Sequence, residues 1–251
     1  MADYAKWLGA GLGWAFGGPI GAIIGLFLGS AVSAGIDPKQ KKIPYNKKRY
    51  EKRPKVDHTK PGDFELSFLI LSAVIIKADG KVEKSELDYV RKYFIEMYGS
   101  KRAENAFKLF NGILKKKIST PQVCAQIREH MSHSSRLQLV HFLFGIAKAD
   151  GEVHVKEIEE IKKISGYLYV SDKDFESIKA MFYNEEFNAY KILEIDKSAT
   201  DNEVKKAYRR MVKKHHPDKL KHLGKEHVKG AEEKFRQIQQ AYETIQKERG
   251  L

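Results

Sequence analysis

Residues 213–219, KKHHPDK, bring together imidazole, carboxylate and ammonium groups that could bind a metal, a nucleic acid or a charged protein partner. A zinc site needs ligands that converge on one point, whereas His215 and His216 are neighbours before a proline and point in different directions. Nucleic-acid binding is disfavoured because no aromatic residues for base stacking are interspersed among the cations. Pro217 followed by Asp218 therefore favours an exposed turn that a protein partner recognises.

Two helices are expected to position this turn. Thr200 and Glu203 have the spacing of a capping box, which begins a helix. That helix must end near His216 because Pro217 disfavours helical geometry in the residue before it. A second helix is expected toward the end of the chain, where apolar residues recur with a period of 3.6: Phe235, Ile238, Ala241, Tyr242 and Ile245. The sequence thus predicts two antiparallel helices joined by an exposed His-Pro-Asp turn.

The first of these helices carries six cations along one side, namely Lys205, Lys206, Arg209, Arg210, Lys213 and Lys214. Such a face steers an acidic partner and increases the rate of association more than the affinity, in a salt-sensitive way. A merely solvated surface is the ordinary alternative. That alternative explains neither the His-Pro-Asp turn nor the apolar pattern around it.

Residues 184–251 resemble a J domain, the module with which DnaJ-type co-chaperones engage a DnaK-type ATPase. The resemblance rests on Tyr190-x-x-Leu193, the KKHHPDK turn and QQAYE in the last helix. It implies that His216, Pro217 and Asp218 stimulate ATP hydrolysis by the partner, and that the basic helix meets an acidic surface on it. The glycine-phenylalanine region and CxxCxGxG repeats of general DnaJ proteins are missing, so direct holding of unfolded clients is not expected.

Residues 63–183 contain an internal repeat with an offset of 71 residues. KADGKVEKSELDYVRKYF begins at Lys77, and KADGEVHVKEIEEIKKIS begins at Lys148. Apolar residues at helical spacing precede and follow each Asp-Gly pair. Two more amphipathic helices are expected between the copies, the second of them opened by Pro121. The region therefore predicts an all-helical bundle built on two helix-turn-helix halves.

Each Asp-Gly turn shares some positions with a calcium-binding EF-hand loop, as Asp79, Gly80 and Glu86 show. The positions that should supply the first oxygen ligands are instead Ile75 and Lys77. The second copy departs from the loop in the same way. Tight calcium binding is therefore not expected.

A structural role explains these turns better. The glycine turns the chain, Val82 and Val153 are expected in the core, and Asp79 and Asp150 are expected to cap the following helix or to receive a cation loosely. The D-G-x-V-x-x-x-E spacing of both copies resembles the tellurite-resistance TerB-like domain. This resemblance implies an all-helical, stress-linked interaction module and supplies no chemistry of its own.

Residues 7–36 contain no charged side chain and exceed the roughly 20 residues that a helix needs to cross a bilayer. A cleaved secretory signal and a buried soluble helix are the alternatives, but the leader is nearly neutral and the glycine content opposes a helix in water. Glycine recurs every four residues along the predicted span, which allows close helix–helix approach and predicts a homodimer: Gly9, Gly13, Gly17, Gly21, Gly25 and Gly29.

The net charge of +13 is unevenly distributed, because more than half of it lies in residues 37–62. A basic segment directly after a span marks the side that stays in the cytoplasm, so the N-terminus is expected outside. The same cations can contact anionic lipid headgroups. Three prolines and the lack of apolar periodicity predict an extended tether. Nucleic acid is not needed to explain the charge.

The order of these parts is similar to the DjlA group of bacterial membrane-anchored J proteins. The expected parts are an anchor (1–36), a basic linker (37–62), a TerB-like helical domain (63–183) and a J domain (184–251). The resemblance implies that the J domain faces the cytoplasm and that the glycine-rich span mediates dimerisation. No glycine- and glutamine-rich linker separates the last two parts, so we expect them to dock rigidly.

These patterns predict an inner-membrane co-chaperone rather than an enzyme. No phosphate-binding G-x-x-x-x-G-K-[ST] loop occurs, so no cofactor is expected, and ATP would be bound by the partner. The single cysteine, Cys124, favours a reducing compartment. An envelope-stress sensor or scaffold, in which the TerB-like domain binds an ion or an unknown protein, is the alternative. No metal site is predicted from the scattered histidines His130, His133, His141 and His154.

Overall fold

The computed structural model describes residues 61–115, 118–151, 153–183, 188–223 and 225–250. All regular structure in these residues is helical, as the sequence predicts. The elements are α3 (Pro61–Ile76), α4 (Lys84–Tyr98), α5 (Ser100–Leu114), α6 (Thr120–His130), α7 (His133–Ala147), α8 (Val155–Tyr167), α9 (Asp172–Ala180), α10 (Asn188–Ile192), α11 (Asp201–His215), the 3₁₀ helix η1 (Pro217–Leu223) and α12 (Lys225–Arg249).

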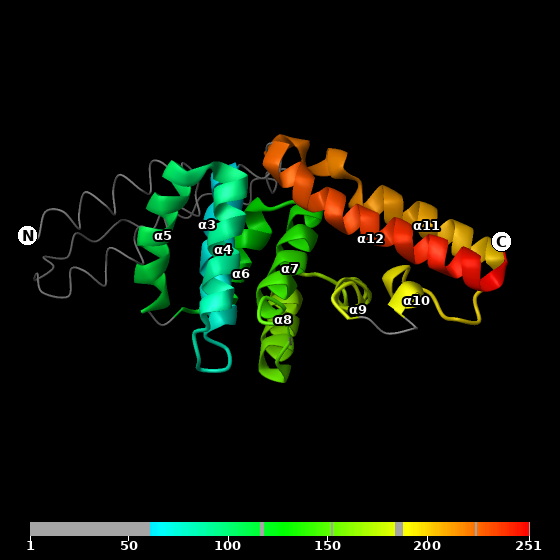
Figure 1. Ribbon diagram of the computed structural model, residues 1–251, viewed down its shortest axis with the longest axis horizontal. Coiled ribbons are helices and arrows are strands. Elements are labelled where there is room, and N and C mark those ends of the chain that lie inside the picture. The colour runs from blue at the N-terminus through cyan, green and yellow to red at the C-terminus, as the bar shows by residue number, and fades with distance from the viewer. Residues whose placement is uncertain (1–60, 116–117, 152, 184–187, 224, 251) are drawn as a thin grey trace, which may run out of the picture.

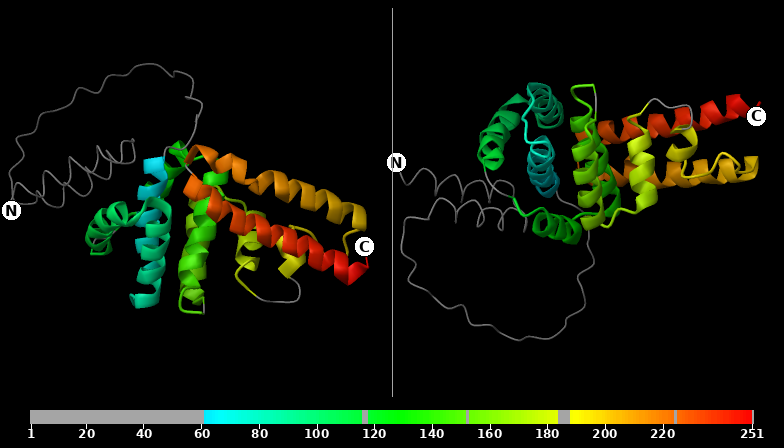
Figure 2. Two further views of the ribbon diagram at one scale, coloured as in Figure 1. Left: turned by 45° about the horizontal axis from the view of Figure 1, so that its top comes forward. Right: turned by 90° about the horizontal axis from the view of Figure 1, so that it is seen from below.

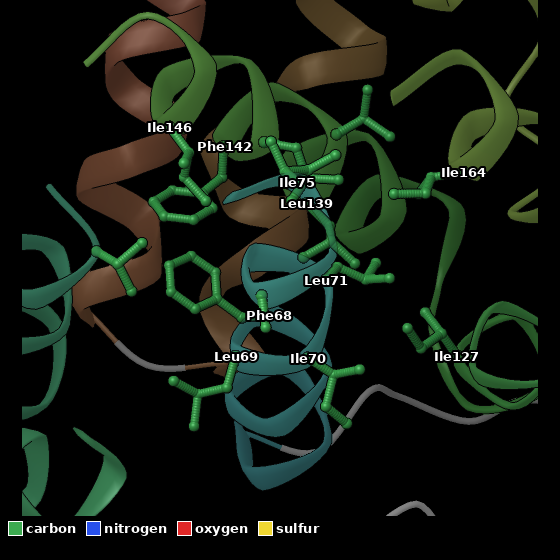
Figure 3. Close-up of a cluster of buried hydrophobic side chains, with 14 of the residues drawn as sticks. Phe68, Leu69, Ile70, Leu71, Ile75, Ile127, Leu139, Phe142, Ile146 and Ile164 are labelled. Atoms are coloured by element: carbon green, nitrogen blue, oxygen red, sulfur yellow. The ribbon is translucent and has the colours of Figure 1, made fainter. Parts of the chain in front are cut away.

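Helices α3 to α9 form a bundle around α3 and α7, which pack against each other at its centre (Figure 1). Both helices are buried on nearly every side, which explains why their apolar residues do not follow a single narrow stripe. The rings of Phe68 and Phe142 lie 3.7 Å apart between centroids, and Phe94 is 4.9 Å from Phe68. Figure 3 shows Phe68 and Phe142 facing each other in this core.

The two Asp-Gly turns have the glycine conformation that the sequence predicts, with φ of 88° at Gly80 and 103° at Gly151. The capping prediction is wrong. Asp79 accepts a hydrogen bond from the Lys81 N–H within the turn, at 2.8 Å, and α4 begins only at Lys84. The prediction for Val82 is also wrong, because its side chain is 51% exposed. Residues 81–83 have no regular secondary structure and separate the Asp79 turn from the first residue of α4.

Val153, the counterpart of Val82 in the second copy, is half-buried and packs against the core. Glu83 and His154 are the N-cap residues of the following helices, and the glutamate at the end of each motif completes a capping box with them. A carboxylate oxygen of Glu86 accepts the Glu83 N–H, and one of Glu157 accepts the His154 N–H, both at 2.9 Å. Both glutamates are buried.

The two buried glutamates interact with each other across the repeat. Burial raises the pKa of Glu86 to about 7, and repulsion from Glu157 and Asp79 contributes in the same direction. Burial also raises the pKa of Glu157, and a hydrogen bond from Glu86 opposes that rise. Glu86 is therefore the carboxyl of the pair that is partly protonated near neutral pH, and its protonated form donates a hydrogen bond to Glu157.

Glu86→Gln is expected to stabilise the protein at pH 8 and to leave stability nearly unchanged at pH 5. The folded-state pKa of Glu86 is raised from 4.5 to about 7, so the native state binds more protons in that window and wild-type stability falls as pH rises through it. A neutral amide removes this loss. Melting temperatures measured from pH 4 to pH 9 test the prediction. The exposed Glu159→Gln on α8 is the control, and a similar rise there would contradict the burial argument.

The last part of the chain has its own small core. Helices α11 and α12 lie side by side, as predicted, and α10 packs against α12 (Figure 2). The Thr200 N–H donates to Glu203, at 2.7 Å, which confirms the capping box. Helix α11 ends at His215, one residue before the predicted limit. The core residues are Tyr190, Leu193, Val204, Ala207, Met211, Ile238, Ala241 and Ile245, with others at the edge.

The expected docking of the two domains is present. Helix α12 packs against α4 and α7, η1 packs against α3 and α7, and α10 packs against α9. Ser177 on α9 donates a hydrogen bond to the Ile192 carbonyl oxygen at 2.7 Å. The end of the α11–α12 pair that carries η1 lies against the bundle, while the C-terminal end points away from it (Figures 1 and 2).

The predicted anchor, its glycine pattern and residues 37–60 of the basic linker lie outside the described residues. The last two linker residues, Pro61 and Gly62, are helical and begin α3, so the predicted extended tether is wrong there. From residue 61 onward, no described helix combines the length and the apolar character that a membrane crossing requires.

Candidate partner-binding surface

The His-Pro-Asp turn is exposed at the junction of α11 and η1. His216 has extended backbone geometry, with φ −60° and ψ 131°, which ends α11 as expected before proline. The side chains of His216 and Asp218 are 47% and 58% exposed. The His216 ring lies edge-on to Phe235 of α12, with 5.9 Å between ring centroids. The turn thus contacts α12 through the His216 ring, and the side chains of His216 and Asp218 are partly exposed to solvent.

Hydrogen bonds fix the two polar side chains relative to each other. Nδ1 of His216 accepts the Asp218 N–H at 3.3 Å, which leaves Nε2 to carry the proton of the neutral ring. The Asp218 carboxylate lies 2.8 Å from the Lys221 ammonium. This contact lowers the pKa of Asp218. The turn therefore presents an imidazole ring beside a carboxylate anion.

The six predicted basic residues differ in their surroundings. Five are exposed, and Lys214 is only partly so. Arg210 donates to the Leu193 carbonyl oxygen at 3.1 Å and lies 3.7 Å from Glu194. Lys214 forms ion pairs with Glu194 and with Asp174 of α9. Arg210 and Lys214 therefore connect α11 to neighbouring segments. The other four cations are all exposed along α11, namely Lys205, Lys206, Arg209 and Lys213.

Sequence reasoning missed part of this surface. An open depression of about 530 Å³ runs from α11 to the turn and is lined by Tyr208, Arg209, Val212, Lys213, His216, Asp218 and Lys219. Tyr208 stacks on Tyr242, with 4.1 Å between ring centroids, so its ring forms a fixed wall. Lys219 adjoins the motif and could have been found from position alone. The depression combines a basic rim with an apolar floor, which suits an acidic protein surface.

The side chains of His215 and His216 have different surroundings, in agreement with the prediction that they point in different directions. His215 is buried, and burial together with the nearby Lys234 holds the pKa of His215 well below its usual range. His141 is also buried, and its Nε2 lies 3.3 Å from Oε1 of Gln237. Within the described residues, no three potential ligand side chains are grouped so that they could hold a metal ion.

Three family models match consecutive parts of the chain. The model described as tellurite resistance protein TerB matches residues 65–180, and the DnaJ domain matches residues 188–250. The co-chaperone DjlA transmembrane domain matches residues 1–38. A comparison with solved structures found no match.

Curated relatives match over nearly the full length. Co-chaperone protein DjlA of Coxiella burnetii is 29% identical over 269 residues, which cover 98% of each chain. The DjlA of Haemophilus influenzae is 29% identical over an alignment that covers 100% of this chain and 99% of its own. The DjlA of Legionella pneumophila is 26% identical, with 98% and 96% covered.

The J-domain match and the exposed turn define the class: the chain is a J-domain co-chaperone. The TerB and DjlA transmembrane matches restrict this class to J-domain co-chaperones of the DjlA kind. The chain is DjlA-like over its whole length.

Proposed function

We propose that this chain is anchored in the bacterial inner membrane, recruits a DnaK-type chaperone and stimulates its ATP hydrolysis. His216, Pro217 and Asp218 carry the stimulation. The exposed cations of α11 attract an acidic surface of the chaperone and orient it toward the turn. The TerB domain recruits a further protein.

One observation carries this proposal. The His-Pro-Asp turn stands exposed at the end of a basic helix, beside an open depression lined by Arg209 and Lys213. A structural turn needs no such depression. The charges around the turn are exposed and therefore screened by salt, so we expect weak, transient binding, which suits a regulator that must release its partner.

The membrane part of the proposal rests on sequence. Residues 7–36 would cross the bilayer once, and the basic residues 37–62 would hold the following domains on the cytoplasmic side. Two copies would associate through the glycines at every fourth position, from Gly9 to Gly29. Gly17→Leu with Gly21→Leu is designed to block that association, and crosslinking in membranes measures it.

Single-turnover ATP hydrolysis by the DnaK-type chaperone of the same organism tests the proposed function. The full-length chain would be supplied in lipid nanodiscs over a range of concentrations and salt. A rate that rises and saturates with the chain supports the proposal. If the rate stays at its basal value throughout, the co-chaperone mechanism is wrong.

Charge reversal on α11 is expected to weaken recruitment rather than the stimulated step. Arg209→Glu with Lys213→Glu should raise the concentration for half-maximal stimulation by about tenfold or more at low salt, because the charges steer association. The effect should shrink as salt rises. Lys173→Glu with Lys179→Glu on α9 reverses the same net charge on another helix and serves as the control. An equal effect of both pairs would mean that net charge, and not this face, is recognised.

A further inference from the structure

The TerB domain holds the His-Pro-Asp turn from both of its flanks. On the N-terminal flank is Lys214, two residues before His216, and on the C-terminal flank is Leu220, two residues after Asp218. The side chains of both flanks are directed to the TerB domain, while those of the motif are exposed.

The N-terminal flank is held by charge. Asp174 of α9 is buried and pairs with the Lys214 ammonium, which also lies 2.6 Å from Glu194. Burial lowers the pKa of Lys214, but its two carboxylate partners outweigh that effect and raise it. The lysine is therefore charged and held at a point where the two domains meet. The next residue, His215, is itself buried.

The C-terminal flank is held by apolar packing. Leu220 of η1 is only 3% exposed and belongs to the core of the α3–α9 bundle, not to the core of the J domain. Ala231 of α12 belongs to the same core. The 3₁₀ helix η1 packs against α3 and α7, and Figure 3 shows the orange-brown ribbon of this part of the chain in the same close-up as the labelled core side chains. A J domain that was free of the bundle would expose Leu220 to water.

Glycine allows α12 to approach closely enough for this packing. A Cβ atom added at Gly230 would lie 3.1 Å from Nε2 of Gln138 and 3.2 Å from the Tyr93 hydroxyl, so even a methyl group is tightly confined. About two turns onward, Gln237 donates to the Met181 carbonyl oxygen at 3.3 Å and contacts His141. Helix α12 is thus fitted to the bundle along two turns.

We infer that the TerB domain positions the His-Pro-Asp turn for the reaction it stimulates, so that Leu220, Asp174 and Gly230 are positioning residues for that activity. This inference rests on the proposed function. The docking covers neither His216 nor Asp218, and the depression in front of them stays open. The TerB domain therefore supports the turn and does not block it.

Gly230→Leu in the full-length chain separates α12 from the bundle without touching the J-domain core. Gly166→Leu on α8 is the matched control, because nothing lies within 4 Å of a Cβ added there. The expected result for Gly230→Leu is a maximal single-turnover rate lower by about fivefold, since a displaced group loses its productive geometry. The concentration for half-maximal stimulation should change less, because the basic face of α11 is unaltered.

Amide hydrogen exchange separates positioning from a general loss of structure. Exchange in η1 should accelerate in Gly230→Leu, while exchange at Leu193 and Ile238 in the J-domain core stays as in the wild type. Asp174→Asn, which weakens the contact to Lys214 without adding bulk, should lower the maximal rate in the same direction. The exposed Asp172→Asn is its control.

The outcomes distinguish this inference from the proposed function. If η1 exchanges faster in Gly230→Leu and the maximal rate is unchanged, positioning by the TerB domain is wrong. A higher maximal rate would also overturn it, because the docking would then restrain the J domain. A wild-type chain that gives no stimulation would instead refute the proposed function on which the inference rests.

Discussion

His216→Gln is expected to reduce stimulation of the chaperone's ATP hydrolysis to near its basal rate, a loss on the order of tenfold or more in the maximal rate. The imidazole is half-exposed, and its Nδ1 accepts the Asp218 N–H. A glutamine is polar and of similar length, but it lacks the flat ring that lies against Phe235. The variant should therefore fold normally and present a turn of altered shape and chemistry.

The measurement is the single-turnover rate at a saturating concentration of the full-length chain, together with the melting temperature. His154→Gln is the control, because His154 is 52% exposed and lies in the second Asp-Gly turn, far along the chain from the motif. An equal loss in both variants would indicate a nonspecific effect of removing a histidine. Full stimulation by His216→Gln would show that the turn is a docking element only.

Lys234→Met is expected to stabilise the protein by a few kcal/mol at pH 7. Lys234 is almost completely buried, and burial lowers its pKa from 10.5 to about 7. Asp174 favours the charged form, but only in part. Methionine has a similar length and fills the same space without a charge. Removing a buried ammonium that has no full compensation should therefore raise stability.

The lowered pKa of Lys234 determines how the stability of the wild-type protein changes with pH. Between pH 7 and pH 10.5 the unfolded state holds a proton that the native state has lost, so wild-type stability rises with pH through that window. The methionine variant should lack this rise, so its advantage should shrink toward pH 10. Melting temperatures from pH 6 to pH 10 test this, with the exposed Lys173→Met as control. A constant difference at every pH would mean that packing, and not charge, is responsible.

The local structure of the J domain could be predicted closely from its sequence. The Thr200–Glu203 pair and Pro217 fix the two ends of α11, since each acts through the backbone within a few residues. The apolar spacing around Ile238 and Ile245 gave the buried face of α12. Interactions between residues that are close in the sequence can be predicted from residue types and their spacing.

Caps and exposures that depend on contacts between distant segments were harder to predict. The pattern treats Val82 and Val153 as equivalents, yet only Val153 packs against the core. Asp79 was expected to cap α4, but its carboxylate accepts the Lys81 N–H, three residues before α4 begins at Lys84. Glu86, which the sequence analysis placed in the calcium-loop comparison and in the TerB-like spacing, completes the capping box of α4 with Glu83.

The sequence predicted which residues belong to the site better than it predicted what each of them contacts. The exposure of His216 follows from its place before Pro217, but the attachment of Lys214 to Asp174 joins residues 40 positions apart. No local pattern distinguishes that lysine from the five other cations of α11. Likewise, Leu220 and Lys234 look like ordinary loop and helix residues until the two domains are placed together.

The docking of α12 and η1 on the bundle has a consequence for how the chain would present a client. Domains on a flexible connector lose orientational entropy when both ends are engaged. Here that freedom is already lost on folding, because α12, η1 and α10 all pack on the bundle. A protein captured by the TerB domain would therefore face the chaperone at one fixed angle, and its shape would decide whether it could be handed over.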